Sequence, residues 1–184
     1  MGLHSYLMYP GRADWRFYLD LSDTSRVLDL GCGWGALAYE LAQEWGEVTA
    51  VDSSIGKLRF LTRRGADSNL DNLYPINLQI GKRIPFRDSQ FDLVVLNGVL
   101  EWIGAYVEGG SPEGLQEGWL RDILGILRPG GTLYIAIENR YGYPYFFGCP
   151  DDHTGMRMTN LMPRWFADRY MHRRTGHGYR TYTH

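Results

Sequence analysis

A glycine-rich turn between two carboxylates is the part of this sequence whose residue types can do chemistry. The turn is Gly31-Cys32-Gly33-Trp34-Gly35, with Asp29 just before it and Asp52 after it. Glycines at this spacing permit a sharp exit from a strand and let a ligand and a helix approach the backbone closely. Asp52 follows at about the 20-residue spacing at which a carboxylate accepts hydrogen bonds from both ribose hydroxyls. The pattern therefore predicts a site for a cofactor that contains adenosine.

The glycine spacing separates the adenosine cofactors from one another. Dinucleotide sites usually carry G-x-G-x-x-G and aim a helix N-terminus at a pyrophosphate, whereas this turn reads G-x-G-x-G. The Asp29 carboxylate disfavours a pyrophosphate but suits an α-amino group and a sulfonium. These residues favour S-adenosyl-L-methionine (SAM) over a nicotinamide dinucleotide, and the chain has no Tyr-x-x-x-Lys pair. A glycine turn without a ligand is the third interpretation.

Alternating strands and helices must hold this turn in place. Short apolar runs predict buried strands, and the run from Phe91 is the most hydrophobic, as expected for a central parallel strand. The expected strands are 26–30, 48–51, 73–78, 91–96 and 132–137. This order predicts an α/β, Rossmann-like fold: a parallel sheet of about five strands, ordered 3-2-1-4-5, with helices on both faces. Further C-terminal strands are expected to be missing.

The helices are expected where apolar side chains recur every three or four residues. The first helix begins at Ala36, carries Leu37, Leu41 and Trp45 on its apolar face, and ends at Gly46 as a C-cap. A second helix, capped by Ser53 or Ser54, is expected to carry Ile55, Leu58 and Leu61 on its apolar face. A third is expected to be stopped by Arg128-Pro129-Gly130-Gly131 and to carry Leu115, Trp119, Ile123, Leu124 and Leu127. A long loop is expected over 139–150, followed by a helix that begins at Pro163, ends at Gly176 and carries Trp165, Phe166 and Tyr170.

Three stretches resemble the motifs of class I SAM-dependent methyltransferases. Val27 to Gly35 looks like motif I, while 84–86 with 91–95, and then 127–131, look like the later motifs in the same order, so that the resemblance covers about residues 25–140. It implies that the three glycines line the methionine portion, that Asp29 lies near its amino group, that Asp52 holds the ribose, and that Asn97 lies near the methionine or the acceptor. The cofactor-binding residues expected are Asp29, Gly31, Cys32, Gly33, Gly35, Asp52, Ser53 and Asn97.

One stretch departs from this family. Relatives often have an acid a few residues before the element that 84–86 resembles, and this acid contacts the adenine amino group. Residues 79–83 of this chain contain no acid. Adenine contacts are therefore expected from the backbone or from Gln79.

The acceptor side is expected after the fifth strand, where a histidine lies among carboxylates. His153 is the candidate general base, because a hydroxyl acceptor must lose its proton; the alternative is that Asp152 and His153 tie down a loop. No metal site is expected. Glu138-Asn139-Arg140-Tyr141-Gly142, Pro150-Asp151-Asp152-His153-Thr154-Gly155 and Tyr179-Arg180-Thr181-Tyr182-Thr183 are also similar to bacterial methyltransferases of cell-surface polysaccharide biosynthesis. This narrower resemblance implies a glycan hydroxyl as acceptor.

Length and composition indicate one globular domain over 1–184. We divide it into an N-terminal segment (1–24), a SAM-binding core (25–140) and an acceptor-side loop with a C-terminal helix (141–184). The net charge of −2 gives no general reason to expect nucleic acid, and no apolar run is long enough for a membrane span. Two cysteines and no evident secretion signal favour a cytoplasmic protein. The fifth-strand edge is expected to pair in a homodimer or with a partner that completes the sheet.

These observations leave two main hypotheses for function. The first is a SAM-dependent methyltransferase that O-methylates a small molecule or a glycan. The second is a non-catalytic SAM-binding module or partner subunit, in which the glycine turn is equally intact. A nicotinamide-dependent dehydrogenase and a nucleic-acid methyltransferase are the weaker alternatives, the latter because neither an Asn-Pro-Pro-Tyr-like element nor a basic balance is present.

Overall fold

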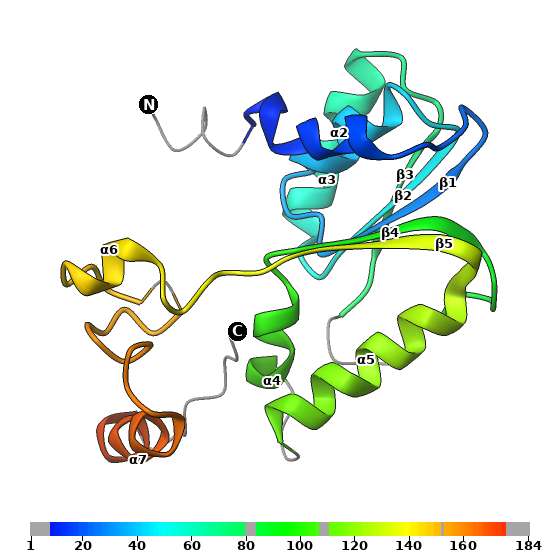
Figure 1. Cartoon of the computed structure of the whole chain (residues 1–184). Helices are drawn as coiled ribbons and strands as arrows, with labels where there is room; N and C mark the ends of the chain where they lie inside the picture. Colours follow the sequence, from blue (N-terminus) through cyan, green and yellow to red (C-terminus); the bar gives the residue numbers. More distant parts are fainter. Residues whose placement is uncertain (1–7, 80–83, 107–110, 152, 176–184) are drawn as a thin grey trace. The chain divides into compact units, whose positions relative to one another are not determined.

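A five-stranded parallel sheet forms the centre of the fold (Figure 1). The computed structural model describes residues 8–79, 84–106, 111–151 and 153–175. The strands are β1 (Arg26–Leu30), β2 (Glu47–Asp52), β3 (Leu73–Asn77), β4 (Phe91–Asn97) and β5 (Leu127–Ala136), in the order β3-β2-β1-β4-β5. The predicted fold class and strand order are therefore confirmed.

The strand register brings the predicted site residues to one edge of the sheet. Leu30, the last residue of β1, pairs with Val51 of β2 on one side and with Leu96 of β4 on the other. Parallel strands end at the same edge, which is where open α/β sheets bind ligands. The turn after β1, Asp52 at the end of β2 and Asn97 at the end of β4 are thus neighbours in space.

The described helices are spread along the whole chain. They are the 3-10 helices η1 (Pro10–Tyr18) and η2 (Leu100–Trp102), and the α-helices α2 (Ala36–Ala42), α3 (Ile55–Asp67), α4 (Ile103–Tyr106), α5 (Pro112–Ile126), α6 (Tyr143–Phe146) and α7 (Arg164–Thr175). Helices α2 and α3 cover one face of the sheet, and the part of α5 from Trp119 to Ile126 covers the other face (Figure 1). None of the described helices has the length and apolar character that would let it cross a membrane.

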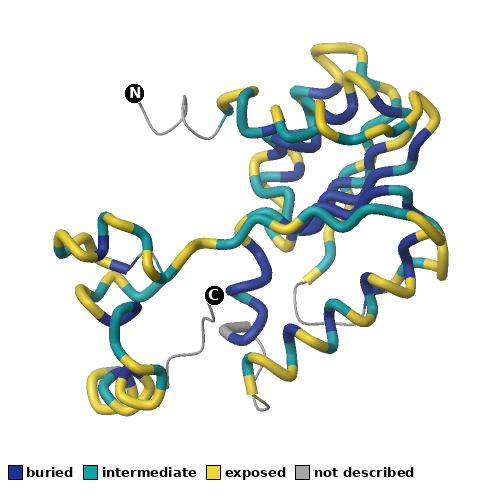
Figure 2. The backbone as a smooth tube through the Cα atoms, in the orientation of Figure 1, coloured by how far each residue is buried: buried dark blue, intermediate teal, exposed yellow. Residues whose placement is uncertain are grey.

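The chain divides into two compact units. Unit 1 comprises Met1–Asn97 and Trp119–Ile135 and holds the sheet; unit 2 comprises Gly98–Gly118 and Ala136–His184. In unit 1 the central strands β1 and β4 are buried almost throughout, whereas the outer strands are partly exposed (Figure 2). Burial on both faces accounts for the continuous apolar runs in the sequence of the central strands.

An aromatic contact holds the N-terminal helix against unit 1. Trp15 of η1 stacks on Tyr134 of β5 with ring centroids 3.8 Å apart, and Ala13 of the same helix is fully buried in the core. The neighbouring Arg16 forms an ion pair with Glu44, which follows α2. These contacts fix the position of Arg12, one turn earlier in η1.

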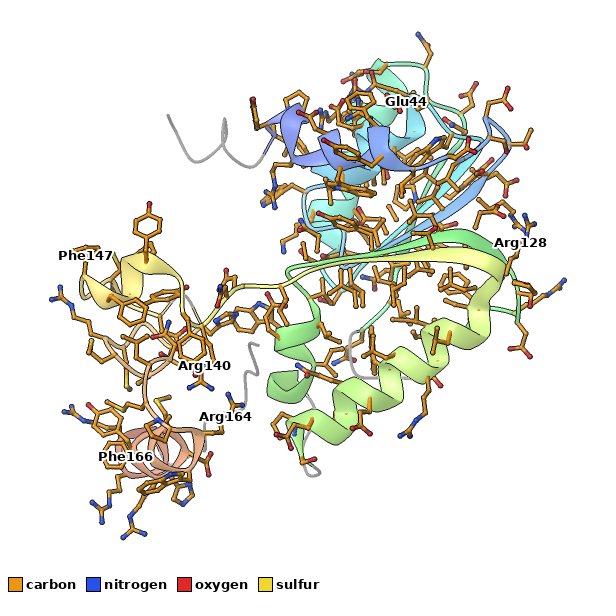
Figure 3. All side chains as sticks on the ribbon, in the orientation of Figure 1. Glu44, Arg128, Arg140, Phe147, Arg164 and Phe166 are labelled. Carbon is orange, nitrogen blue, oxygen red and sulfur yellow. The ribbon has the colours of Figure 1, made fainter. Side chains whose placement is uncertain are left out.

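A carboxylate fastens three strands together at the opposite end of the sheet. Asp92 of β4 accepts hydrogen bonds from the backbone N–H of Arg26 in β1 at 2.8 Å and from Nη1 of Arg128 in β5 at 2.8 and 2.9 Å (Figure 3). The expected end of the preceding helix before 128–131 is confirmed, but the expected strand begins earlier than residue 132. Helix α5 ends at Ile126 and β5 begins at Leu127, so the proline and glycines lie within the strand.

Some of the expected helix details are wrong. Gly46 is not the C-cap of α2, which ends at Ala42; it is needed because an added Cβ would lie 2.8 Å from the backbone of Thr24. The expected 139–150 loop contains the short helix α6. Four expected apolar positions, Ile55, Leu124, Trp165 and Phe166, are exposed, and Ala167 and Met171 are the buried residues of α7. Gly176 lies outside the described residues.

We expect Gly35→Ala to destabilise the protein by roughly 2 kcal/mol or more. Gly35 has φ +78°, where a side chain is strained, and an added Cβ would lie 2.8 Å from Cγ of the buried Leu61 of α3. The matched control is Gly118→Ala in α5, where an added Cβ meets nothing within 4 Å and should gain about 0.5–1 kcal/mol. Urea denaturation measures both values, and equal stabilities of the two variants would contradict this packing.

Candidate cofactor site and a buried charged cluster

The glycine turn is held by the end of strand β2. Its three glycines all have positive φ: +77° at Gly31, +57° at Gly33 and +78° at Gly35. The backbone N–H groups of Gly31 and Cys32 both donate to the Val51 carbonyl oxygen, at 2.7 and 2.9 Å. Other residue types would be strained in this conformation, so the glycines are required by the path of the backbone.

Asp52 continues this attachment with its side chain. One carboxylate oxygen accepts from the Gly33 N–H at 3.0 Å and the other from the Ser54 N–H at 2.8 Å, and the residue is 6% exposed. The Asn77 side chain donates to the Asp52 carbonyl oxygen, which holds the backbone at the same point. A carboxylate offers about four acceptor sites, so hydrogen bonds from ribose hydroxyls remain possible. Ser53, the adjacent predicted residue, is exposed.

Asp29 is a buried carboxylate whose charge is poorly compensated. It is 2% exposed, and its Oδ2 has no hydrogen-bond partner among the described residues. The pKa of Asp29 is raised to about 7: burial and the nearby Asp52 raise it, while a backbone hydrogen bond from Ala38 and the charge of Arg12 lower it. A cationic group beside Oδ2 would satisfy this oxygen and favour the ionised form.

A cavity of about 260 Å³ opens beside Asp29. It is lined by Arg12, Asp29, Gly31, Cys32, Gly33, Trp34, Ala36, Leu37, Lys57 and Asn97. An added Cβ on Gly33 would meet nothing within 4 Å, so the missing side chain leaves space there. One carboxylate and two cations, Arg12 and Lys57, line the same cavity. That charge arrangement complements the ammonium and the carboxylate of an amino acid.

The predicted residues divide between this cavity and its support. Asp29, Gly31, Cys32, Gly33 and Asn97 line the cavity, whereas Gly35 packs against α3, and Asp52 and Ser53 lie beside the turn. Burial raises the pKa of the Cys32 thiol, which therefore stays protonated and is not a nucleophile. Cys32 and Cys149 are both free. Of the adenine stretch, Gln79 is described and 80–83 lie outside the described residues.

Sequence reasoning missed Arg12 and Lys57 as residues that line the cavity, whereas Trp34 belongs to the predicted turn. Arg12 belongs to a segment that we treated as an N-terminal extension, and no sequence pattern indicated that η1 packs against α2 and β5. Lys57 lies in the first turn of α3, a helix whose start was predicted. The charge of Lys57, one of only two lysines in the chain, was the signal available for it.

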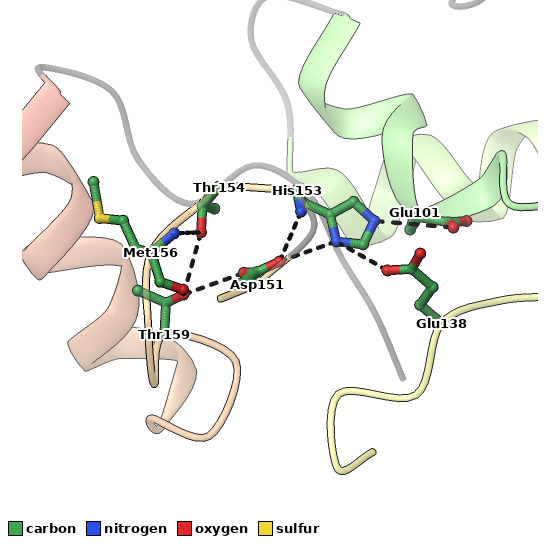
Figure 4. A network of polar contacts seen from close by, with 7 residues as sticks. All are labelled: Glu101, Glu138, Asp151, His153, Thr154, Met156 and Thr159. Atoms are coloured by element: carbon green, nitrogen blue, oxygen red, sulfur yellow. Dashed lines mark hydrogen bonds and ion pairs between the residues drawn. The ribbon is translucent and has the colours of Figure 1, made fainter. Parts of the chain in front are cut away.

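Unit 2 contains a second group of charged side chains, centred on His153 (Figure 4). Nδ1 of His153 lies 3.2 Å from Asp151 Oδ1 and 3.4 Å from Glu138 Oε2, and Nε2 lies 3.9 Å from Glu101 Oε1. The Trp102 ring packs against the imidazole with centroids 4.7 Å apart. Burial alone would lower the pKa of His153, but the hydrogen bond to Asp151 and the nearby carboxylates of Glu101 and Glu138 raise it to about 9.

This environment bears on the candidate general base. An imidazole that already carries a proton at neutral pH cannot accept another one. His153 also donates its backbone N–H to Asp151 Oδ1 at 2.9 Å, and Thr159 donates to Asp151 Oδ2 at 3.2 Å. These contacts favour the alternative in which His153 holds its loop. Asp152 lies outside the described residues.

We expect Asp29→Asn to stabilise the unliganded protein, and more so at pH 8 than at pH 5. The pKa of Asp29 in the folded protein, about 7, is well above the ordinary value of an aspartate, 3.8. The stability that comes from its tighter proton binding in the folded state is fully present below about pH 4 and is lost as the pH rises through 7. The gain in the free energy of unfolding of Asp29→Asn over the wild type should therefore be larger at pH 8 than at pH 5 by roughly 2–3 kcal/mol. Urea denaturation tests this, with the exposed Asp71→Asn as control; an advantage independent of pH would contradict it.

Comparisons with known proteins agree with this geometry. A family described as a methyltransferase domain matches residues 21–162. The demethylmenaquinone methyltransferase of Corynebacterium urealyticum is 33% identical over 118 residues, which cover 64% of this chain and 44% of the relative. A ubiquinone biosynthesis O-methyltransferase of Xylella fastidiosa is 28% identical over 116 residues, covering 63% and 43%. The chain thus spans less than half the length of these curated relatives.

A solved structure extends the likeness to three dimensions. It is described as a putative S-adenosyl-L-methionine-dependent methyltransferase from Methanococcus maripaludis, is 26% identical, and covers 70% of this chain and 55% of that chain with a TM-score of 0.55. The matched range includes the glycine turn, all five strands and every residue that lines the cavity except Arg12. With this strand order, the match shows that the chain belongs to the methyltransferase domain family of class I SAM-dependent methyltransferases.

Proposed function

We propose that unit 1 binds SAM with its methionine end in the cavity beside Asp29, and that the protein methylates a hydroxyl group. The observation that carries this proposal is Asp29, whose Oδ2 finds no hydrogen-bond partner in the part of the chain that the structure describes and which lines one cavity together with Arg12 and Lys57. An α-amino group would satisfy that oxygen, and an α-carboxylate would meet the two cations. In this proposal Asp52, beside the turn, accepts from the ribose hydroxyls.

When bound, SAM supplies an electrophilic methyl group on its sulfonium. The residues of this chain hold and orient the cofactor, and alignment with the acceptor contributes much of the rate in such displacements. Burial of Asp29 strengthens its attraction for an ammonium group, because the local dielectric is low. Asn97, at the end of β4, lines the same cavity, where its side-chain amide can orient the bound amino acid.

For the acceptor, we propose a hydroxyl on a small molecule or on a glycan. The O-methyltransferase name of one relative supports a hydroxyl, and the narrower resemblance to polysaccharide-associated enzymes supports a sugar. Unit 2 exposes the rings of Tyr143 and Phe147, which are 79% and 85% exposed. Such rings can stack on a sugar or on a planar acceptor.

The residues of the narrower resemblance also have structural roles. Arg140 donates through Nε to the Asn160 carbonyl oxygen at 3.0 Å and through Nη2 to that of Met162 at 2.8 Å. Gly155 has φ +67° and its N–H donates to the Asp151 carbonyl oxygen. These contacts shape the loops of unit 2. The narrower resemblance therefore supports a shared loop structure directly and a sugar acceptor only indirectly. The 179–183 stretch lies outside the described residues.

Asp52→Ala should weaken binding of S-adenosylhomocysteine by about 10–100-fold. This corresponds to the loss of a charged hydrogen-bond pair, about 1.5–3 kcal/mol. The variant should also lower the unfolding temperature, because two backbone N–H groups lose their acceptor. Calorimetric titration of the folded variant measures the affinity, with the exposed Asp71→Ala as control. An unchanged affinity would show that Asp52 is only part of the turn.

Turnover separates methyl transfer from simple cofactor binding. The protein is incubated with SAM and either a phenolic acceptor or a nucleotide-linked sugar, and S-adenosylhomocysteine and the methylated product are measured by mass spectrometry. We expect product from at least one acceptor class. Tight binding of S-adenosylhomocysteine without any product would favour the non-catalytic module, and absence of binding would overturn the cofactor assignment itself.

A further inference from the structure

In the described part of unit 2, three carboxylates gather around one imidazole. Glu101, Glu138 and Asp151 surround the single imidazole of His153. The side chains of Glu101, Asp151 and His153 are each at most 2% exposed, whereas that of Glu138 is 44% exposed. A buried carboxylate is costly unless positive charge or hydrogen bonds compensate it, so the buried Glu101 is the residue to examine first.

Two buried atoms of this cluster point to what is bound. Glu101 Oε2 and His153 Nε2 have no hydrogen-bond partner among the described residues. Nε2 faces the Glu101 carboxylate (Figure 4) but lies 3.9 Å from Oε1, which is beyond hydrogen-bond distance. Two metal–ligand bonds of about 2.0–2.2 Å span such a separation with an obtuse angle between them. One ligand atom each from Glu101, Glu138 and His153 lie within 4.8 Å of one another.

We propose that Glu101, Glu138 and His153 bind a divalent metal ion, and that Asp151 orients the imidazole for it. Asp151 Oδ1 lies within hydrogen-bond distance of both the backbone N–H and Nδ1 of His153, at 2.9 and 3.2 Å. A carboxylate can only accept here, so Nδ1 keeps its hydrogen, and once the ion has displaced the proton from Nε2 the lone pair of the ring is on Nε2. A second carboxylate that holds the other ring nitrogen is the usual partner of a metal-binding histidine.

The ligand set indicates the class of metal. One imidazole nitrogen and two carboxylates suit Zn²⁺ or Mn²⁺, whereas Mg²⁺ and Ca²⁺ prefer oxygen ligands alone. The partly exposed Glu138 lies at the solvent side of the cluster, so water can complete the coordination. Binding of the ion displaces any proton from His153 to solvent. This inference concerns unit 2 alone and does not rest on the proposed function.

The test is calorimetric titration of the chelator-treated full chain with Zn²⁺ and with Mn²⁺. We expect one equivalent of either ion to bind, and Glu138→Gln, at a solvent-exposed position, to weaken binding at least tenfold. Glu101→Gln should do the same, and circular dichroism establishes whether this buried variant is folded. The matched control is Glu113→Gln at an exposed position in the first turn of α5, which should bind like the wild type.

A second measurement follows the histidine directly. Asp151→Asn should weaken Mn²⁺ binding without removing a ligand, and the electron paramagnetic resonance signal of free Mn²⁺ measures the bound fraction. No binding to the wild type would overturn the proposal and leave the cluster as ion pairs around a protonated imidazole. Binding that persists unchanged in both Glu138→Gln and a folded Glu101→Gln would place the ion elsewhere and overturn it equally.

Discussion

The attachment of the glycine turn to the end of β2 is the interaction on which the structure of unit 1 depends. Gly31 and Cys32 donate to the Val51 carbonyl oxygen, and Gly33 donates to the Asp52 carboxylate. A turn with positive φ at three positions cannot satisfy these N–H groups by continuing as a strand or a helix. A buried N–H without an acceptor is costly. The end of the neighbouring strand β2 therefore supplies the acceptors, and these hydrogen bonds fix the conformation of the turn.

This attachment gives the cavity its charge as well as its shape. Asp29 ends up inside the sheet, where burial and the nearby Asp52 raise its pKa to about 7. The unliganded protein thus contains an unfavourable carboxylate that a bound cationic group would relieve. Stability given up at a binding site is a common cost of function. The contact of Trp15 with Tyr134 also contributes to the charge of the cavity, because it holds η1, which brings Arg12 to the cavity.

Polar contacts hold the loops of unit 2 together. Asp151 connects His153 to Thr159, and Arg140 reaches two backbone carbonyl groups of the following loop. Buried polar groups give a unique arrangement only when each finds a partner. Buried atoms of Glu101, His153 and Asn160 have no hydrogen-bond partner among the described residues, and those of Glu101 and His153 lie together in one cluster.

The sequence by itself determined the strand order and the turn of this protein, and the tertiary structure decided which charged residues meet. Short apolar runs separated by helical periodicity identify a parallel sheet, because each segment must bury its own apolar face. Periodicity was less informative about helix orientation: Ile55 and Leu124 are exposed although they lie beside buried positions. The cluster of Glu101, Glu138 and His153 has no local signature, because its members come from separate segments. Their meeting depends on the path of the chain between those segments, which no local pattern encodes.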